Sequence, residues 1–380
     1  MTDLTFRIPT TVLYGSDSLT RVPQLVTDFG SRAALVVDPS LYDHGVVSRT
    51  RDLFSKQGFK VIVFDEVRDR ATTIAASSLV SLLRASQVQV VISLGGMRTA
   101  AVARLAAMAA GSHMSVFRIA DGSEAVGASL PVILVPTAFR DHFALADHFT
   151  VIEGTANRLS VVTGPPAKYA IIDPRLSLTL SPRYAAAEMM DMLLACIEGY
   201  MSAKSTFIAD TLFLRAVDTI KEAVDGLLWN ADDPEPWSRA SEAALLEAVG
   251  ITMSSQGIGG ALTYAIAGSL RVPKAFVAAT LLPHVLDYHS EAVSEKVAKV
   301  ARALGEDVPG INLHDDAHQA STVARRLIGK LGLPGRLQEI GLNFDAVSQA
   351  AQSVVHMPMV RNSAVSFGSD TIHQLVRQAF

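Results

Sequence analysis

Short apolar runs rich in β-branched residues alternate with helical patterns over the first half of the chain. Four runs have the length and composition of buried strands: Ala33–Asp38, Lys60–Phe64, Val88–Leu94 and Pro131–Val135. Between them, apolar residues recur at helical spacing, as in the segments 19–29 and 74–83. This alternation predicts a parallel sheet whose two faces are both covered by helices.

The pattern changes near residue 179. Before that point three more extended segments occur, and we expect them to form a hairpin at the edge of the sheet: Phe149–Ile152, Leu159–Val162 and Tyr169–Asp173. After it, long segments rich in alanine and leucine are punctuated by prolines: Pro236, Pro273, Pro283, Pro309 and Pro334. We therefore predict an α/β domain of residues 1–178 followed by an all-helical domain of residues 179–380.

Composition limits the kinds of partner. The 380 residues carry 33 basic and 37 acidic side chains, which gives a net charge of -4, and no run of Lys or Arg occurs. Nucleic acid and anionic lipid would need a basic surface, so we expect a small-molecule substrate instead. The most apolar segments, 100–110 and 185–201, are interrupted by charged residues and do not predict a membrane span.

The amino terminus and the cysteine content bear on the compartment. Asp3 and Arg7 lie where a secretory signal would need an uninterrupted apolar segment. The single cysteine, Cys196, excludes an intrachain disulfide and a zinc site built from several cysteines. Its place within an apolar helical segment favours a small core residue over a nucleophile. These features predict a cytoplasmic protein.

Five motifs follow one another at suitable spacing: Ile8–Gly15, Gly95-Gly96 after a strand, Val135-Pro136-Thr137, the helix 191–200 and Leu281–Val285. With them, the chain resembles the iron-containing alcohol dehydrogenase family, and its maleylacetate reductase branch in particular, over nearly its full length. The resemblance implies a Rossmann-like nucleotide-binding domain, a helical domain with a metal, a cleft between them and commonly a homodimer.

The metal site of the family is only partly matched. The family binds its metal through an aspartate and three histidines, and Asp191 stands at the aspartate position. One helical turn later, Ala195 replaces a histidine. Tyr264 and Lys274 stand at the other two ligand positions, and Gly268 stands where a catalytic histidine usually lies. Since a catalytic metal needs several oxygen or nitrogen donors, we expect no metal to be bound.

The motifs that bind the coenzyme in the family can be recognised here, although some of their residues differ. Gly95 and Gly96 end a strand and open a helix, so that backbone N–H groups and the helix dipole can face a pyrophosphate, and the resemblance adds Thr137 to this site. Arg98, in the first helical turn, is either a phosphate partner or a solvated side chain. Asp38 either accepts hydrogen bonds from ribose hydroxyls, which would favour NAD over NADP, or caps the next turn.

The loop after Thr137 departs from the family, which has small residues there. This chain has bulky or charged side chains instead, and they could fill a nicotinamide pocket: Phe139, Arg140, His142 and Phe143. The three arginines Arg98, Arg104 and Arg140 indicate an anionic partner, which is either the phosphates of NAD or NADP or a substrate carboxylate.

Two of the replaced ligand positions carry polar side chains, and these suggest a mechanism. We predict that the ammonium of Lys274 pairs with Asp191 and polarises a substrate carbonyl, with Tyr264 as the proton donor and His142 as a further candidate acid or base. A nearby cation stabilises a phenolate, which suits this role for Tyr264. Alternatively, Lys274 only neutralises Asp191 and preserves the fold.

The predicted function is that of a metal-independent NAD(P)-linked oxidoreductase that acts on a small carbonyl or alcohol. One alternative is a non-redox enzyme on the same scaffold, of the lyase or hydrolase type, with acid–base or Schiff-base chemistry by Arg140, Asp141, His142, Tyr264 and Lys274. Another is a catalytically silent family member that serves as a binding or partner subunit. Metal analysis and titration with NAD, NADH and NADPH distinguish these functions.

Overall fold

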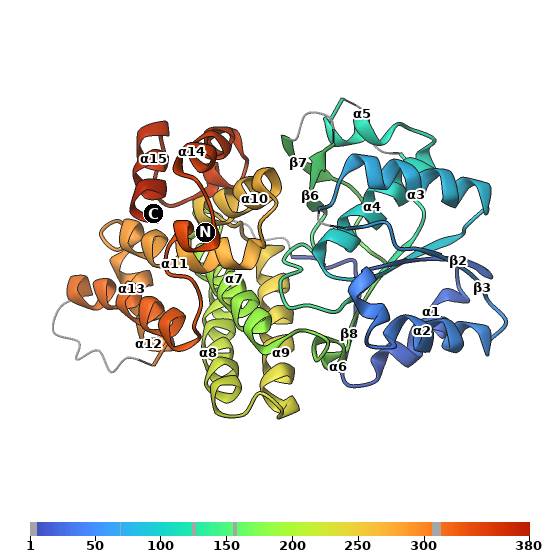
Figure 1. The fold of residues 1–380 in the computed structure, drawn as a ribbon, viewed down its shortest axis with the longest axis horizontal. Helices are drawn as coiled ribbons and strands as arrows, with labels where there is room; N and C mark the ends of the chain where they lie inside the picture. The colour runs from blue at the N-terminus through green and yellow to red at the C-terminus, as the bar shows by residue number, and fades with distance from the viewer. Residues whose placement is uncertain (1–5, 69, 124–126, 155–157, 306–312) are drawn as a thin grey trace. The chain divides into compact units, whose positions relative to one another are not determined.

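The computed structural model describes residues 6–68, 70–123, 127–154, 158–305 and 313–380, and for residues 313–316 it describes the backbone only. The chain forms two compact units, Met1–Thr179 (unit 1) and Leu180–Phe380 (unit 2). Figure 1 shows strands in unit 1, with helices on both faces of the sheet, and helices throughout unit 2.

Unit 1 is built on a six-stranded parallel sheet with the strand order β1-β8-β5-β4-β2-β3. The strands are β1 (Thr11–Tyr14), β2 (Arg32–Val37), β3 (Lys60–Phe64), β4 (Val90–Gly95), β5 (Val132–Pro136) and β8 (Tyr169–Ile172). All six residues of β4 are buried, as expected of a central strand that packs against helices on both faces. The predicted parallel sheet is confirmed.

Eight helices surround this sheet. They are η1 (Ser18–Arg21), α1 (Val22–Val26), η2 (Pro39–Tyr42), α2 (Val46–Ser55), α3 (Thr73–Ala85), α4 (Met97–Ser112), α5 (Val116–Ala120) and α6 (Pro174–Ser177), among the described residues. Parallel strands need crossover connections, and α2, α3 and α4 supply them between β2, β3, β4 and β5.

The predicted edge hairpin is only partly correct. β6 (His148–Glu153) and β7 (Arg158–Thr163) pair as an antiparallel hairpin, but they form a separate two-stranded sheet. The third segment, β8, lies inside the main sheet and pairs in parallel with β1 and β5. Its central residues are buried on both faces, whereas β1 is partly exposed and takes the edge position.

Unit 2 consists of helices among the residues that the structure describes. They are α7 (Pro182–Met201), α8 (Phe207–Trp229), α9 (Pro234–Ile251), α10 (Ile258–Leu270), α11 (Lys274–His289), α12 (Ser294–Ala303), α13 (Leu313–Lys330), η3 (Leu337–Ile340), α14 (Phe344–Gln352), η4 (Ser353–His356), η5 (Val360–Asn362) and α15 (Ser369–Gln378). This agrees with the all-helical pattern expected of the second half.

One of the prolines expected between helices lies elsewhere. Pro283 lies inside α11 instead of separating two helices. An interior proline costs a helix about 3 kcal/mol because it removes a hydrogen bond and crowds the preceding turn. α11 packs against α7, α10 and α13 and is buried over most of its length, and we attribute its continuity to this packing.

α7 is the central helix of unit 2. Ser181 caps its first turn by accepting a hydrogen bond from the backbone N–H of Tyr184, and Pro182 supplies the fixed φ of a first helical residue. Every residue from Ala185 to Met201 is buried, so the helix has no solvent face along that length. Polar side chains on α7 are therefore placed inside the protein, where they must find partners.

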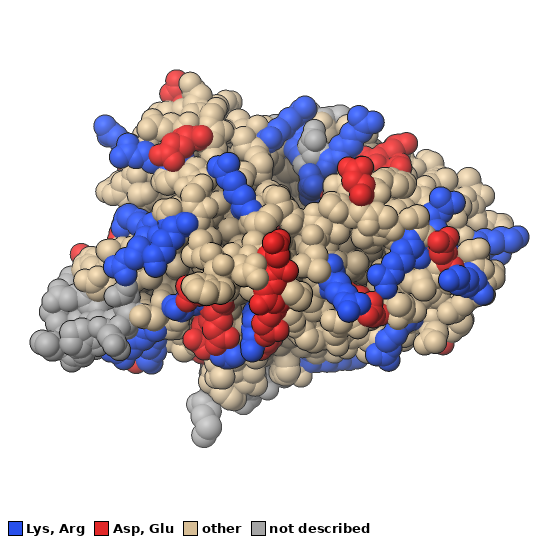
Figure 2. Space-filling view, turned by 60° about the horizontal axis from the view of Figure 1, so that its bottom comes forward, with Lys and Arg blue, Asp and Glu red and all other residues tan. Residues whose placement is uncertain are grey.

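The described residues contain no helix that is both long enough and apolar enough to cross a membrane. Basic and acidic side chains are interspersed over the face drawn in Figure 2. This mixture agrees with the small net charge of -4.

Close packing around α7 generates the first testable prediction. A Cβ atom added at Gly199 of α7 would overlap the ring of Phe213 in α8. Gly199→Ala should therefore lower the free energy of unfolding by about 1–3 kcal/mol, because the buried ring has no room to move. Denaturant-induced unfolding followed by circular dichroism measures the change.

Gly329→Ala is the matched control. This glycine is also helical, but no atom outside its own stretch of helix lies within 4 Å of an added Cβ. Alanine should stabilise this helix by about 0.4–1 kcal/mol or leave it unchanged. Equal effects of the two substitutions would show that packing against Phe213 does not limit position 199.

Candidate functional site

The Gly95-Gly96 turn joins the end of β4 to the start of α4. A Cβ atom at Gly95 would lie 2.6 Å from Thr99 Oγ1 and 3.1 Å from Asp38 Cβ, so a side chain does not fit there. The backbone N–H of Thr137, from β5 and its following loop, donates to the carbonyl of Gly95 at 3.2 Å. The structure therefore brings the predicted residues Asp38, Gly95, Gly96 and Thr137 to the same edge of the sheet.

Asp38 and Arg98 form an ion pair beside this turn. Arg98 Nη2 lies 3.2 Å from Asp38 Oδ2, and Arg98 Nη1 donates to the carbonyl of Arg68 at 2.8 Å. Asp38 Oδ1 accepts from the backbone N–H and the hydroxyl of Ser40 at 3.1 and 2.8 Å, which caps η2. The turn-capping interpretation of Asp38 is thus observed, and Arg98 is held between two oxygens of the protein.

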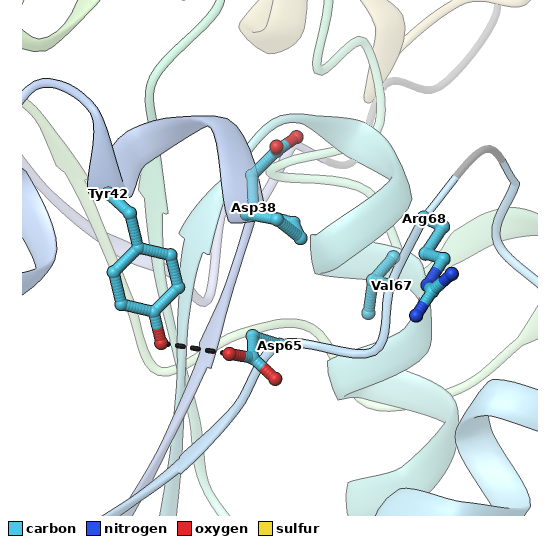
Figure 3. A pocket seen from close by; sticks show the side chains of 6 residues that line it. Asp38, Tyr42, Asp65, Val67 and Arg68 are labelled. Carbon is cyan, nitrogen blue, oxygen red and sulfur yellow. Dashed lines mark hydrogen bonds between the residues drawn. The ribbon is translucent and has the colours of Figure 1, made fainter.

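A hollow of about 510 Å³ lies next to Asp38. Its lining residues are Asp38, Pro39, Tyr42, Asp65, Val67 and Arg68. In Figure 3 the hydroxyl of Tyr42 faces Asp65, to which it donates at 2.9 Å, while Val67 and Arg68 lie on the other side of Asp65. Sequence reasoning missed Tyr42, Asp65 and Arg68, although they lie in the segments that follow β2 and β3, and carboxyl ends of parallel strands form such sites in α/β sheets.

The loop after Thr137 is packed. His142 is fully buried, and its ring meets that of Phe143 edge-on at 6.4 Å between centroids. Arg140 Nη1 lies 3.4 Å from the sulfur of Met97 in the first turn of α4. These side chains belong to unit 1, as do all the predicted coenzyme-binding residues.

Arg104 does not serve as the anion partner that we expected from the sequence. It is buried in α4 and donates to the backbone carbonyls of Phe143, Ala146 and His148 at 3.0, 2.8 and 3.3 Å. Its guanidinium also lies 4.4 Å from the centroid of the Phe149 ring. Burial lowers the pKa of Arg104 to about 10. The expectation is therefore wrong, because backbone carbonyls take the hydrogen bonds of the guanidinium and fix the loop.

Unit 2 brings together the other three predicted residues, from three helices. Lys274 Nζ, at the start of α11, lies 2.6 and 2.7 Å from the two carboxylate oxygens of Asp191 in α7. The same Nζ lies 4.4 Å from the centroid of the Tyr264 ring in α10. The side chains of Lys274 and Asp191 are only 7% and 2% exposed, so the pair is buried. The ion pair predicted from the sequence is present.

The donors at this position do not fit a divalent metal ion. Both oxygens of Asp191 are engaged by an ammonium, which has no lone pair to offer a metal. One turn after Asp191, the buried Ala195 offers no donor atom. Within the described residues, no group of three or more His, Cys, Asp or Glu side chains could hold a metal ion.

Glu198 joins the helices that carry this cluster, and sequence reasoning missed it. Its carboxylate accepts from the backbone N–H groups of Gly257, Gly259 and Gly260 at 3.0, 2.6 and 2.8 Å, at the start of α10. A Cβ atom at Gly257 would lie 2.9 Å from Glu198 Oε1, so the close approach requires glycine. A buried anion at a helix amino terminus is favoured by the helix dipole.

Burial raises the pKa of Glu198, while the three backbone N–H groups and then Lys274 act in the opposite direction. Glu198 lies seven residues after Asp191 and so on the same side of α7. That spacing and the glycine-rich start of α10 were the available sequence signals. The carboxylate ties the helix of Asp191 to the helix of Tyr264.

Replacement of this carboxylate should loosen the cluster. In Glu198→Gln the amide nitrogen cannot accept hydrogen bonds, so at least one buried N–H of α10 loses its partner. The free energy of unfolding should fall by about 1–3 kcal/mol, which denaturant titration measures. Glu222→Gln, at an exposed glutamate of α8, is the control and should change it by less than about 0.5 kcal/mol. A Glu198→Gln protein as stable as the control would contradict the role of the carboxylate.

Comparisons with known proteins agree with this architecture. The model of the iron-containing alcohol dehydrogenases matches residues 9–174, and the model of the C-terminal part of the Fe-containing alcohol dehydrogenase family matches residues 185–380. A choline dehydrogenase of Bacillus subtilis (strain 168) is 22% identical over 383 residues, which cover 99% of this chain and 95% of that protein.

Solved structures confirm the predicted fold. A 1,3-propanediol oxidoreductase superposes with a TM-score of 0.93 at 21% identity, covering 100% of both chains. A sulfoacetaldehyde reductase from Bifidobacterium kashiwanohense in complex with NAD+ gives a TM-score of 0.86 at 17% identity, covering 100% of this chain and 99% of that one. The chain belongs to the iron-containing alcohol dehydrogenase family.

Proposed function

We propose that the protein is an NAD(P)-linked oxidoreductase that reduces a small carbonyl compound or oxidises the corresponding alcohol without a metal ion. Membership of the family and the names of its relatives support the redox class. The one observation that supports the metal-independent part is the buried Lys274–Asp191 pair, at the position that the family resemblance assigns to the metal.

In this proposal unit 1 holds the coenzyme. The glycine turn and the first N–H groups of α4 suit a pyrophosphate, because no side chain caps this helix and a helix amino terminus favours an anion. Asp38 and Arg98 would meet the adenosine ribose, and Thr137 would lie beside the turn. A bound nicotinamide would supply or accept the hydride.

Lys274 would replace the Lewis acid by a fixed positive charge. A charge that polarises a carbonyl acts most strongly where water is excluded, and the Lys274 side chain is only 7% exposed. Asp191 holds the ammonium through both carboxylate oxygens and so fixes its position. The ammonium would stabilise the negative charge that develops on the carbonyl oxygen of the substrate.

Tyr264 would supply the proton. Its ring lies against the ammonium, which favours the phenolate left after its hydroxyl gives a proton to the developing alkoxide. His142 remains the candidate for a second acid or base, because an imidazole can exchange protons near neutral pH. Glu198 would act indirectly, by holding the helix of Tyr264 against the helix of Asp191.

We also propose a homodimer, a cytoplasmic location and a place in the maleylacetate reductase branch. The dimer and the branch come from the family resemblance. The location is supported by Cys196, which is a free, buried thiol and fits a reducing compartment.

A pair of variants tests whether Lys274 acts in catalysis or only neutralises Asp191. Lys274→Met alone leaves a buried carboxylate without its cation and should destabilise the protein by about 3–5 kcal/mol. The double variant Asp191→Leu/Lys274→Met removes both charges and should restore the free energy of unfolding to near the original value. Both variants should lose carbonyl reduction, measured as NADH or NADPH oxidation with a panel of small aldehydes and ketones.

The double variant distinguishes a catalytic role from a structural one, because its stability should be close to that of the original protein. Unchanged turnover in a folded double variant would show that the ion pair is only structural. Arg183→Met is the control, since Arg183 is a cation near the start of α7 that stacks on Phe276 and has no part in the pair. It should leave turnover unchanged.

Metal removal gives a second test. Dialysis against EDTA should leave turnover unchanged, and elemental analysis should find far less than one zinc or iron per chain, because an ammonium occupies the Asp191 oxygens. The variant Tyr264→His/Lys274→His is the positive control, since an aspartate and two histidines form a common catalytic zinc set. It should gain zinc in the same analysis.

Fluorescence titration with NADH and NADPH should show binding to the metal-free protein. Coenzyme binding without metal would support the proposal. Turnover that is lost with EDTA and restored by zinc or iron would contradict it. Absence of coenzyme binding would favour non-redox acid–base chemistry or a silent partner subunit.

A further inference from the structure

The strand-end aspartate of a nucleotide-binding fold discriminates between coenzymes by its charge. A free carboxylate accepts hydrogen bonds from the 2′-hydroxyl of the adenosine ribose and repels a 2′-phosphate, whereas a nearby arginine accommodates the phosphate. Asp38 stands at this position, directly after β2. Its hydrogen bonds and charge partners therefore indicate which ribose the site takes.

The Asp38 carboxylate is already largely used by the protein. Oδ1 accepts two hydrogen bonds from Ser40, and Oδ2 accepts one from Arg98. A carboxylate offers about four acceptor positions, so these three bonds leave roughly one for a ribose hydroxyl. The side chain is 18% exposed, which also limits its approach to a ligand.

Arg98 cancels the charge that would repel a phosphate. Its guanidinium lies 3.2 Å from Asp38 Oδ2 and is itself 37% exposed, so it is partly accessible to a ligand. The bond from Nη1 to the carbonyl of Arg68 fixes the guanidinium at the start of α4. There the helix dipole adds positive potential of its own.

The hollow beside Asp38 is likewise lined by charged side chains of both signs. A second arginine, Arg68, lines it and is exposed. The other carboxylate of the lining, Asp65, accepts a hydrogen bond from the Tyr42 hydroxyl on the side of the hollow that lies away from Arg68 (Figure 3). With Arg98, two cations and two carboxylates meet here, so the site lacks the negative excess that excludes NADP.

We propose that Arg98 makes this ribose site accept an adenosine 2′-phosphate, so that the protein takes NADP(H) as well as NAD(H). The proposal rests on the proposed coenzyme-dependent function and names the residue that sets its coenzyme range. Asp38 remains the partner of the unphosphorylated ribose through its last acceptor position. Arg98, with Arg68 nearby, supplies the charge-assisted hydrogen bonds that a phosphate requires.

Adenosine fragments test this without turnover. Calorimetric titration of the unmodified full chain with 5′-AMP and with 2′,5′-ADP should give dissociation constants within about tenfold of each other, a ratio that corresponds to 1.4 kcal/mol or less. In Arg98→Met the binding of 2′,5′-ADP should weaken by about tenfold or more, while that of 5′-AMP changes by less than about threefold.

Two further variants test the charge of Asp38 and provide a control for the loss of an arginine. Asp38→Asn removes the negative charge and keeps Arg98, so 2′,5′-ADP should bind several-fold more tightly than to the unmodified chain and 5′-AMP more weakly. Arg49→Met is the matched control, since Arg49 forms an exposed ion pair with Asp17 in the same unit. It should leave both dissociation constants unchanged.

Several outcomes would overturn the proposal: preference of the unmodified chain for 5′-AMP by about 100-fold, equal losses for both fragments in Arg98→Met, or no binding of either fragment. Failure of the proposed function gives a different result. In that case the fragments bind and respond to Arg98→Met, but neither NADH nor NADPH is oxidised with any carbonyl of the panel.

Discussion

The proposed chemistry of unit 2 depends on one interaction, the buried pair between Lys274 and Asp191. Two opposite charges are taken out of water at great cost, and this cost is offset only if each charge finds its partner with good geometry. The ammonium meets both carboxylate oxygens at 2.6 and 2.7 Å and also faces an aromatic ring. Such a pair fixes one positive charge at one place inside the protein, and a fixed charge is what carbonyl polarisation needs.

Glycines decide how closely the helices that carry these groups can approach. Gly257 and Gly259 let the Glu198 carboxylate approach the start of α10, where it also accepts from the N–H of Gly260 and so binds α10 to α7. In unit 1, Thr99 and Asp38 lie so close to Gly95 that a side chain at this position does not fit. In both units glycine is therefore required where polar side chains lie close to the backbone.

The sequence predicts features that depend on local pattern and composition. Four strands of the main sheet (β2, β3, β4 and β5), the all-helical second half and the pairing of Lys274 with Asp191 could be predicted, because apolar periodicity and replaced ligand positions are visible in one chain. The interior position of β8 and the continuity of α11 through Pro283 could not, since both depend on tertiary packing. Arg104 was misassigned because a sequence does not show that backbone carbonyls of a later loop surround it.

The ring of Phe213 has a consequence for variation within the family. It fills the space left by two glycines on different helices, Gly199 and Gly250, and a Cβ atom at Gly250 would lie 2.6 Å from its edge. Side chains at positions 199, 213 and 250 therefore compete for the same space. A homologue that carries alanine at either glycine position should carry a smaller residue at position 213, so these three positions should covary in alignments although none of them belongs to the proposed coenzyme site or to the ion pair.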